Sequence, residues 1–329
     1  MMSKDTFLEV KNLRTWFHTP EGVVKSVDGV SFSIERGETL ALVGESGCGK
    51  TVTSLSLIRL LADTAEVQAD YLKVDGEEIL ELTKEEARKL RGSKISMIFQ
   101  EPMTSLNPVY KIERQLGEVF HLHDPSLSRQ QVFEKSVEIL KRVGVPNPAE
   151  RLKVYPHQLS GGLRQRVMIA ISLASNPQML IADEPTTALD VTIQAQIIDL
   201  LKQLQKESNM SILLITHDFG VVSQIAQRVA VMYAGKIVEE GPLEKIFEDP
   251  WHPYTKLLIL SIPGIKVTRG GRLESISGTV PNPLHFPEGC RFAPRCPYAM
   301  EICRKEPPEE FISGDRRVSC YLKRGENHD

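Results

Sequence analysis

The sequence predicts an α/β protein with a parallel-sheet core, and three observations lead to that prediction. A buried strand at residues 39–43 is followed by a glycine-rich loop and then by a helix at residues 52–61. Two compact apolar runs, residues 178–182 and 211–216, are typical of fully buried parallel strands. Hydrophobic residues make up 41% of the 329-residue chain, which is enough for a sizeable core.

Composition narrows the class of protein. The 40 Lys and Arg residues against 43 Asp and Glu give a net charge of -3, whereas a nucleic-acid-binding domain more often carries a basic surplus. No apolar run approaches the roughly 20 residues that cross a bilayer, and residues 1–10 lack the apolar core of a signal peptide. We therefore expect a soluble, cytoplasmic protein that binds no nucleic acid, which is compatible with docking on a membrane protein.

Short antiparallel strands are expected near the N-terminus, because residues 8–43 alternate apolar and polar positions between Gly and Pro breaks. The later elements are strands at residues 71–74, 95–99, 229–233 and 236–239, and a helical region at residues 108–156. The last two strands are expected to form a hairpin around Ala234 and Gly235. The composition changes near Pro250, because the rest of the chain is rich in proline and contains four of the five cysteines. A domain boundary is therefore predicted at residues 250–265.

The loop after the first buried strand has two glycines separated by four residues and followed by Lys50 and Thr51, which fits a phosphate-binding pattern. Glycines let the backbone turn its N–H groups toward phosphate oxygens, and the helix N-terminus adds its positive end. Lys50 is expected to reach the β- and γ-phosphates, and the Thr51 hydroxyl to hold Mg²⁺. The alternative is a glycine-rich turn without a ligand. The predicted nucleotide contacts are Gly44, Ser46, Gly47, Cys48, Gly49, Lys50, Thr51 and Val52.

Cys48 lies inside this loop, at the start of the helix and beside Lys50. Both surroundings favour the thiolate form of a cysteine. The expected role of Cys48 is only to be small, and thiol-modifying reagents are expected to block ATP binding.

Two acids end the apolar strand at residues 179–182. In a phosphate-loop ATPase the first acid, here Asp183, binds Mg²⁺ through the coordination shell of the ion. The second, Glu184, can orient and polarise the attacking water. A buried strand that ends in acids is also compatible with a purely structural cap, but the position downstream of Lys50 favours catalysis.

The segment Leu159-Ser160-Gly161-Gly162-Leu163-Arg164-Gln165 resembles the signature motif of ATP-binding-cassette (ABC) proteins. Its serine and glycines would expose N–H groups at the start of a helix, whereas an ordinary helix N-cap is the structural alternative. The resemblance covers residues 8–265. Gln100 resembles the Q-loop glutamine, Asp190 lies in a segment like the D-loop, and His217 resembles the switch histidine.

An aromatic residue that stacks on adenine is also part of the ABC pattern. Phe17, with Trp16 as the second choice, is expected to fill this place, although aromatic residues in an N-terminal strand also serve a core.

The resemblance implies an ABC nucleotide-binding domain with a RecA-like parallel-sheet core, an N-terminal antiparallel β subdomain and a helical signature subdomain. It places the ATPase domain at residues 1–258, its helical subdomain at about 101–165 and a small Pro/Cys-rich extension at 259–329. It also implies a head-to-tail dimer in which ATP lies between Lys50 of one chain and the signature residues of the other. The implied catalytic residues are Glu184, His217 and Gln100, the implied Mg²⁺ ligands are Thr51, Gln100 and Asp183, and the implied cross-dimer nucleotide contacts are Ser160, Gly161, Gly162 and Asp190.

Four cysteines in the extension, Cys290, Cys296, Cys303 and Cys320, suggest a metal site, because disulfides are disfavoured in the cytoplasm. The intervals of five, six and sixteen residues lack the paired C-x-x-C of most structural zinc sites. Cys296 is followed by proline, as in some iron–sulfur motifs. A metal cluster, a zinc ion and four unliganded buried cysteines all remain open on spacing alone.

A narrower resemblance is carried by His252-Pro253-Tyr254-Thr255, Gly289-Cys290-Arg291-Phe292 and Arg295-Cys296-Pro297. These segments are similar to the C-terminal extension of dipeptide and oligopeptide importer ATPase subunits. The resemblance implies a [4Fe-4S] cluster on the four cysteines, with Zn²⁺ as the alternative, beside ATP and Mg²⁺. It implies two membrane permease subunits, a second ABC ATPase subunit and an extracytoplasmic peptide-binding protein as partners. The implied location is the cytoplasmic face of the cell membrane.

Other functions are compatible with the same motifs. An importer of nickel or of an opine would share the architecture. A non-transport ABC ATPase of DNA repair or translation would usually carry coiled-coil insertions, duplicated cassettes or basic arms, and the sequence shows none. A redox-regulated ATPase built on the cysteines is a third hypothesis.

Overall fold

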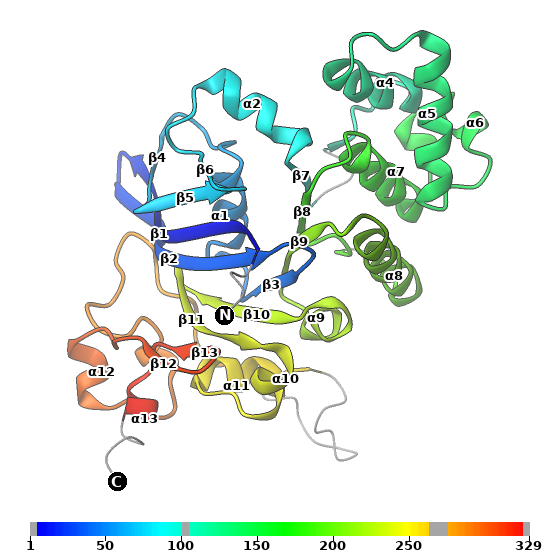
Figure 1. Cartoon of the computed structure of the whole chain (residues 1–329). Coiled ribbons are helices and arrows are strands. Elements are labelled where there is room, and N and C mark those ends of the chain that lie inside the picture. Colours follow the sequence, from blue (N-terminus) through cyan, green and yellow to red (C-terminus); the bar gives the residue numbers. More distant parts are fainter. Residues whose placement is uncertain (1–4, 101–104, 188, 263–275, 325–329) are drawn as a thin grey trace. The chain divides into compact units, whose positions relative to one another are not determined.

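The computed structural model of the chain describes residues 5–100, 105–187, 189–262 and 276–324. They divide into two compact units, whose elements are labelled in Figure 1. The first unit comprises Met1–Glu81 and Leu214–Asp329, and the second comprises Leu82–Leu213. Within the described ranges, no helix combines the length and the apolar character that a membrane span needs.

The first unit begins with a five-stranded antiparallel sheet, whose two long strands come from the alternating N-terminal segment. The sequence predicted several short strands, whereas β1 and β2 are 14 residues long each and pair along most of their length. The expected breaks occur inside these long strands, as bulges in their register and as Gly29 at φ +86°. The strands are β1 (Thr6–Thr19), β2 (Gly22–Glu35), β4 (Ala65–Gln68), β5 (Tyr71–Val74) and β6 (Glu77–Glu78).

A second sheet is built on β3, whose five residues are all buried. β3 pairs in parallel with β10, and β10 forms the predicted antiparallel hairpin with β11. Ala234 and Gly235 turn the chain at φ +46° and +82°, the left-handed values that a tight hairpin turn needs. β13 adds to β11, and β12 adds to β13, so the C-terminal segment extends this sheet. The strands are β3 (Thr39–Val43), β10 (Arg228–Tyr233), β11 (Lys236–Pro242), β12 (Phe311–Ser313) and β13 (Arg316–Val318).

Aromatic side chains form part of the core of the first unit. Tyr233, Tyr254 and Phe292 contact one another with ring centroids 4.7 to 5.3 Å apart, and all three are fully buried. Phe292 belongs to the cysteine-bearing segment, so this segment shares the core of the sheet. The helices of the unit are α1 (Lys50–Leu57), α9 (Phe219–Ile225), α10 (Leu243–Glu248), α11 (Pro253–Leu260), α12 (Glu301–Lys305) and α13 (Tyr321–Arg324).

The second unit combines two parallel strands, β7 and β8, with the predicted helical region. α4 ends at His123, two residues before Pro125, and α6 begins at Pro148, as expected where proline cannot continue a helix. A capping box between Ser128 and Gln131 starts α5. The elements are α2 (Lys84–Ser93), β7 (Ile95–Ile98), α4 (Ile112–His123), α5 (Arg129–Arg142), α6 (Pro148–Arg151), α7 (Gly161–Leu173), β8 (Met179–Asp183) and α8 (Val191–Ser208). The buried strand β9 (Ser211–Thr216) spans the boundary between the units.

Candidate nucleotide-binding site

The predicted phosphate loop lies between β3 and α1, as the sequence pattern requires. Gly47 and Gly49 have φ of +77° and +107°, values that a residue with a side chain rarely adopts. A Cβ on Gly44 would lie 2.1 Å from the backbone oxygen of Met232, so no larger residue fits there. The glycines therefore allow the loop to curl directly into the start of α1, where the first N–H groups of a helix are available to an anion.

Lys50 lies inside this loop. Its side chain is nearly buried, and Nζ donates to the carbonyl oxygens of Gly44 at 2.8 Å and Glu45 at 3.0 Å. The loop therefore already orients the ammonium group, and phosphate oxygens would take the place of these carbonyls. Ser46 and Thr51 are exposed and Val52 is half-buried, so the Thr51 hydroxyl is accessible to a ligand.

Cys48 corrects one prediction. The residue is 1% exposed, and burial raises the pKa of its thiol despite the nearby Lys50 ammonium. Burial disfavours a charged group more than the helix start and Lys50 favour it. The surroundings in the fold therefore disfavour the thiolate, whereas the expected role of Cys48 as a small residue of the loop is compatible with this burial.

Two residues that the sequence did not single out for the site, Tyr254 and Arg295, hold the loop through Glu45. The Tyr254 hydroxyl accepts a hydrogen bond from the Glu45 N–H at 2.9 Å, and burial raises the Tyr254 pKa, so this hydroxyl stays neutral. The Glu45 carboxylate receives two hydrogen bonds from the Arg295 guanidinium at 2.7 and 2.9 Å. These partners lie 209 and 250 positions away from Glu45, so only the fold brings them to the loop.

His217 and the aromatic candidates also belong to the first unit. His217 is exposed and directly follows β9, and Asp218 beside it caps α9 through the Gly220 N–H at 2.7 Å. Phe17 is half-buried in β1, opposite Val24 and Ala65. The neighbouring Trp16 has the Lys25 ammonium 5.2 Å from its ring centroid. Stacking of either ring on adenine stays a prediction.

In the second unit, the structure brings the predicted catalytic acid and the Q-loop glutamine together. Glu184 Oε2 accepts hydrogen bonds from Gln100 Nε2 at 3.1 Å and from Thr187 Oγ1 at 2.8 Å. Glu184 has φ of +46°, a backbone strain that non-glycine residues often carry at functional sites. Asp183, the last residue of β8, is buried.

The signature segment begins α7, and the D-loop segment begins α8. Ser160 is the N-cap of α7 and accepts a hydrogen bond from the Leu163 N–H at 3.4 Å. Gly161 and Gly162 form the first turn, and a Cβ on Gly162 would lie 3.0 Å from Ile193 of α8. Asp190 caps α8 through the Ile193 N–H at 2.9 Å. Both polar residues thus have a capping role, which is compatible with the predicted nucleotide contacts.

The four C-terminal cysteines line one cavity of the first unit, and none of them forms a disulfide. Burial raises the pKa of Cys290 and Cys296, and raises that of Cys320 to about 11. Among the residues that the structure describes, no three His, Cys, Asp or Glu side chains are gathered closely enough to hold a single metal ion.

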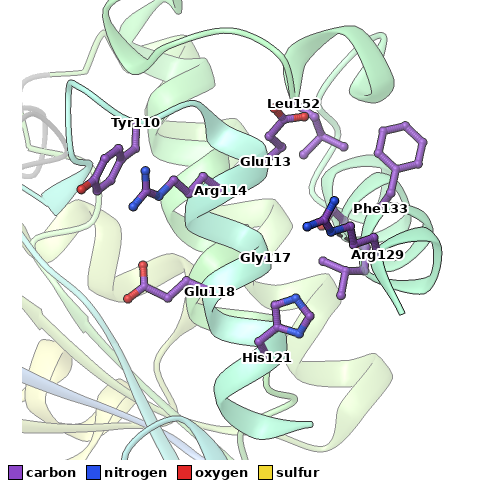
Figure 2. Close-up of a pocket in the computed structure, with 11 residues that line it drawn as sticks. Tyr110, Glu113, Arg114, Gly117, Glu118, His121, Arg129, Phe133 and Leu152 are labelled. Carbon is purple, nitrogen blue, oxygen red and sulfur yellow. Dashed lines mark hydrogen bonds between the residues drawn. The ribbon is translucent and has the colours of Figure 1, made fainter. Parts of the chain in front are cut away.

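A separate cavity of about 700 Å³ lies in the helical region of the second unit, between α4 and α5 (Figure 2). Tyr110 and Arg114 lie together on one side, with the guanidinium 3.6 Å from the ring centroid. Glu118 lies on the same side as Arg114, and Arg129 and Phe133 lie on the other side (Figure 2). The cavity thus offers aromatic surface together with charges of both signs.

Comparison with known proteins gives two family matches. Residues 27–187 match the family described as ABC transporter, and residues 238–303 match the oligopeptide/dipeptide transporter C-terminal region. The second match includes Arg295 and the first three of the four cysteines.

The curated relatives match over nearly the whole chain. The oligopeptide transport ATP-binding protein AppD of Bacillus subtilis is 49% identical over 96% of this chain and 97% of its own. OppD of Salmonella typhimurium, an oligopeptide transport ATP-binding protein, is 48% identical over 96% of this chain and 94% of its own. DppD of Haemophilus influenzae, a dipeptide transport ATP-binding protein, is 47% identical over 95% of this chain and 94% of its own.

Solved structures confirm the predicted fold. The dimeric structure of MJ0796, a bacterial ABC transporter cassette, matches with a TM-score of 0.65 at 27% identity, over 72% of this chain and 98% of the cassette. Together with the family matches and the relatives, this shows that the chain belongs to the ABC family, among the ATP-binding proteins of oligopeptide and dipeptide transport.

Proposed function

We propose that this chain is the ATP-hydrolysing subunit of an importer that takes up dipeptides and oligopeptides through partner subunits in the membrane. One observation carries the proposal: the ABC motifs and the oligopeptide/dipeptide transporter C-terminal region occur together in one chain. The nucleotide motifs retain every group that hydrolysis needs, including Lys50 and Glu184, so this subunit is proposed to be active rather than a degenerate partner.

In the proposed mechanism, the phosphate loop binds ATP and the carboxylate activates water. The loop amides and Lys50 would hold the phosphates, and Thr51 with Asp183 and Gln100 would hold Mg²⁺, which neutralises developing charge on the phosphates. Glu184 is proposed to accept a proton from the attacking water, and its hydrogen bond from Gln100 would orient its carboxylate. His217 is proposed to contact the γ-phosphate.

Two cassettes are proposed to close head to tail over ATP. Ser160, Gly161 and Gly162 begin a helix of 13 residues, whose N-terminal N–H groups favour the phosphates of a nucleotide held by the other chain. Asp190 is proposed to join this contact. The similar MJ0796 cassette was solved as a dimer, which supports such pairing.

The permease subunits are proposed to dock on the helical region of the second unit. The cavity between α4 and α5 supports this proposal, since aromatic and charged side chains such as Tyr110 and Arg114 are suited to hold a short polar helix. A peripheral position on the cytoplasmic face of the membrane follows from such docking. An extracytoplasmic peptide-binding protein would then deliver the cargo, and it would set the selectivity together with the permease.

The resemblance implies a [4Fe-4S] cluster on the four cysteines, and the donor set fits it. Four thiols, none of them in a disulfide, line one cavity. Each thiolate of such a cluster binds a separate iron, whereas a zinc ion needs its ligands around one point. A bound cluster would supply a cross-link for a small core and a one-electron redox centre. Iron and acid-labile sulfide in the anaerobically purified chain would support the cluster, and stoichiometric zinc without sulfide would exclude it.

Peptide cargo is tested by purifying the importer through a tag on this chain and reconstituting it in lipid vesicles. ATP hydrolysis is expected to rise when peptide-loaded binding protein is added, because cargo binding closes the cassette dimer. Stimulation by nickel or by an opine, with no response to peptide, would replace the peptide hypothesis by one of these cargoes. Hydrolysis that follows the oxidation state of the cysteines, with no response to any cargo, would favour the redox-regulated hypothesis.

A further inference from the structure

An ion pair links the phosphate loop to the cysteine-bearing segment. Arg295 lies directly before Cys296, and its two terminal nitrogens bond both carboxylate oxygens of Glu45 at 2.7 and 2.9 Å. The Arg295 side chain is 4% exposed, and that of Glu45 is 29% exposed. Such a two-pronged pair fixes both distance and orientation, and partial burial protects it from screening by salt.

The rest of the guanidinium is held as well. Arg295 Nε donates to the Ser277 carbonyl at 2.9 Å, and Nη1 lies 3.4 Å from the Tyr233 hydroxyl. On the other side of the pair, the Glu45 backbone N–H is bound by Tyr254. Glu45 is therefore anchored through both its side chain and its backbone, between the loop glycines at positions 44 and 47.

A second arginine of the same segment supports the far end of the loop. Arg291, directly after Cys290, donates to the Ala234 carbonyl at 2.5 Å and pairs with Asp28. Gly235, which follows Ala234 in the chain, donates its N–H to the Cys48 carbonyl at 2.9 Å. The segment between the first two cysteines thus contacts the loop directly through Arg295 and indirectly through the β10–β11 turn.

The negative charge of Glu45 explains why this ion pair matters for nucleotide binding. A carboxylate inside a polyphosphate-binding loop repels the ligand, because like charges a few ångströms apart interact strongly where water is partly excluded. Arg295 neutralises that charge and at the same time fixes the backbone beside Gly44.

We propose that Arg295 is a positioning residue of the ATPase site, acting through Glu45 to shape the phosphate loop and cancel its negative charge. The cysteine-bearing segment is then a working part of the nucleotide site as well as an extension of the fold. This inference rests on the proposed ATPase function.

The test is a double-mutant cycle in the affinity for Mg²⁺-ADP, measured by calorimetry on the full chain. Arg295→Met is expected to weaken ADP binding by about tenfold or more, and to raise KM for ATP more than it lowers kcat, because the carboxylate is left unpaired beside the phosphates. Glu45→Gln in the same chain removes that carboxylate, so Glu45→Gln with Arg295→Met is expected to bind ADP several-fold more tightly than Arg295→Met alone. A loss of affinity that came only from the other contacts of Arg295, with the Ser277 carbonyl and Tyr233, would not be rescued by removing the Glu45 carboxylate.

Arg317→Met is the matched control. Arg317 is a half-buried arginine of the same C-terminal segment, and the partners that the structure gives it are Glu240, Glu310 and the Ser31 carbonyl, which lie outside the loop. The ADP affinity of this variant is expected to match that of the wild type, and thermal unfolding of each variant shows whether it is folded. Lys50→Ala is the reference for a chain that has lost the nucleotide site, and its ADP affinity is expected to be far below that of the wild type.

Each outcome decides the question. Unchanged ADP affinity in Arg295→Met, or an equal loss in Arg317→Met, would overturn the positioning role. Absence of rescue in the double variant would overturn charge neutralisation as its cause. If the wild type does not bind ADP, or if Lys50→Ala binds as well as the wild type, the proposed nucleotide site fails and this inference fails with it.

Discussion

Glu184 combines the features expected of a residue that activates water. It follows a buried strand, has a left-handed backbone conformation, and shares one carboxylate oxygen between Gln100 and Thr187. The two hydrogen bonds restrict the rotation of the carboxylate. The sequence predicted Glu184 and Gln100 separately, and the fold adds the contact between them.

Replacing Glu184 by Gln should separate binding from hydrolysis. The amide keeps the shape and the hydrogen-bond acceptor but cannot take up a proton, so hydrolysis is expected to fall at least about 10²-fold. ATP affinity should stay close to that of the wild type, with accumulation of an ATP-bound dimer. Steady-state hydrolysis and size-exclusion chromatography with ATP check both points. Wild-type turnover in this variant would exclude Glu184 as the base.

Contacts between residues that lie far apart in the sequence could not be predicted from the sequence. Arg295 and Tyr254 stand out in the sequence only as parts of family-like segments, and Glu45 is an ordinary position of the loop. No local periodicity links positions 250 residues apart, so pairing of this kind follows from the sheet order and from packing around Phe292. The burial of Cys48 was missed for a similar reason, because its neighbours in sequence suggested a charged thiol while its neighbours in space exclude water.

Among the elements, those with strong patterns were predicted well. The strands at residues 71–74 and 211–216 occur as expected, and the phosphate loop joins a strand to a helix. The strands β4, β6, β12 and β13 and the helices α2, α8, α9, α10, α11, α12 and α13 were not predicted. The missed strands have two to four residues, too few for an alternating pattern, and they are held by pairing with longer strands.

α11 begins with an unusual cap. His252 is 1% exposed, and its Nδ1 accepts a hydrogen bond from the Tyr254 N–H at 3.1 Å. Burial lowers the pKa of His252 to about 3. The neutral ring is thus an acceptor in the folded state, whereas an unfolded histidine binds a proton below about pH 6.5.

This cap predicts a loss of stability in mild acid. Because the folded pKa lies below the unfolded one, the stabilisation is complete above about pH 6.5 and decreases as the pH falls toward 3. His252→Asn keeps an acceptor for the helix but removes the titrating ring. Between pH 7.5 and pH 5, the wild type should lose about 2 kcal/mol more of its free energy of unfolding than this variant. Urea unfolding at both values gives the difference, and equal losses would contradict the assigned role of His252.

For the whole molecule, the chain joins a nucleotide-binding fold to a C-terminal segment that is continuous with it. β13 extends the sheet of β3 and β10, Phe292 enters the core of that sheet, and Arg295 reaches the phosphate loop. The boundary near residue 258 and the extension at 259–329 stay predictions. A sequence pattern finds the change in composition at the extension, but the packing of that segment depends on side chains that meet only in the folded chain.

The proposed motor function is tested most directly by uptake of labelled dipeptides and oligopeptides in the source organism. A strain that lacks this chain is compared with the same strain carrying the wild type or Glu184→Gln. Uptake is expected to be lost in the deletion strain and restored by the wild type alone, because transport requires hydrolysis by this subunit. Undiminished uptake in the deletion strain, or full rescue by Glu184→Gln, would contradict an importer powered by this chain.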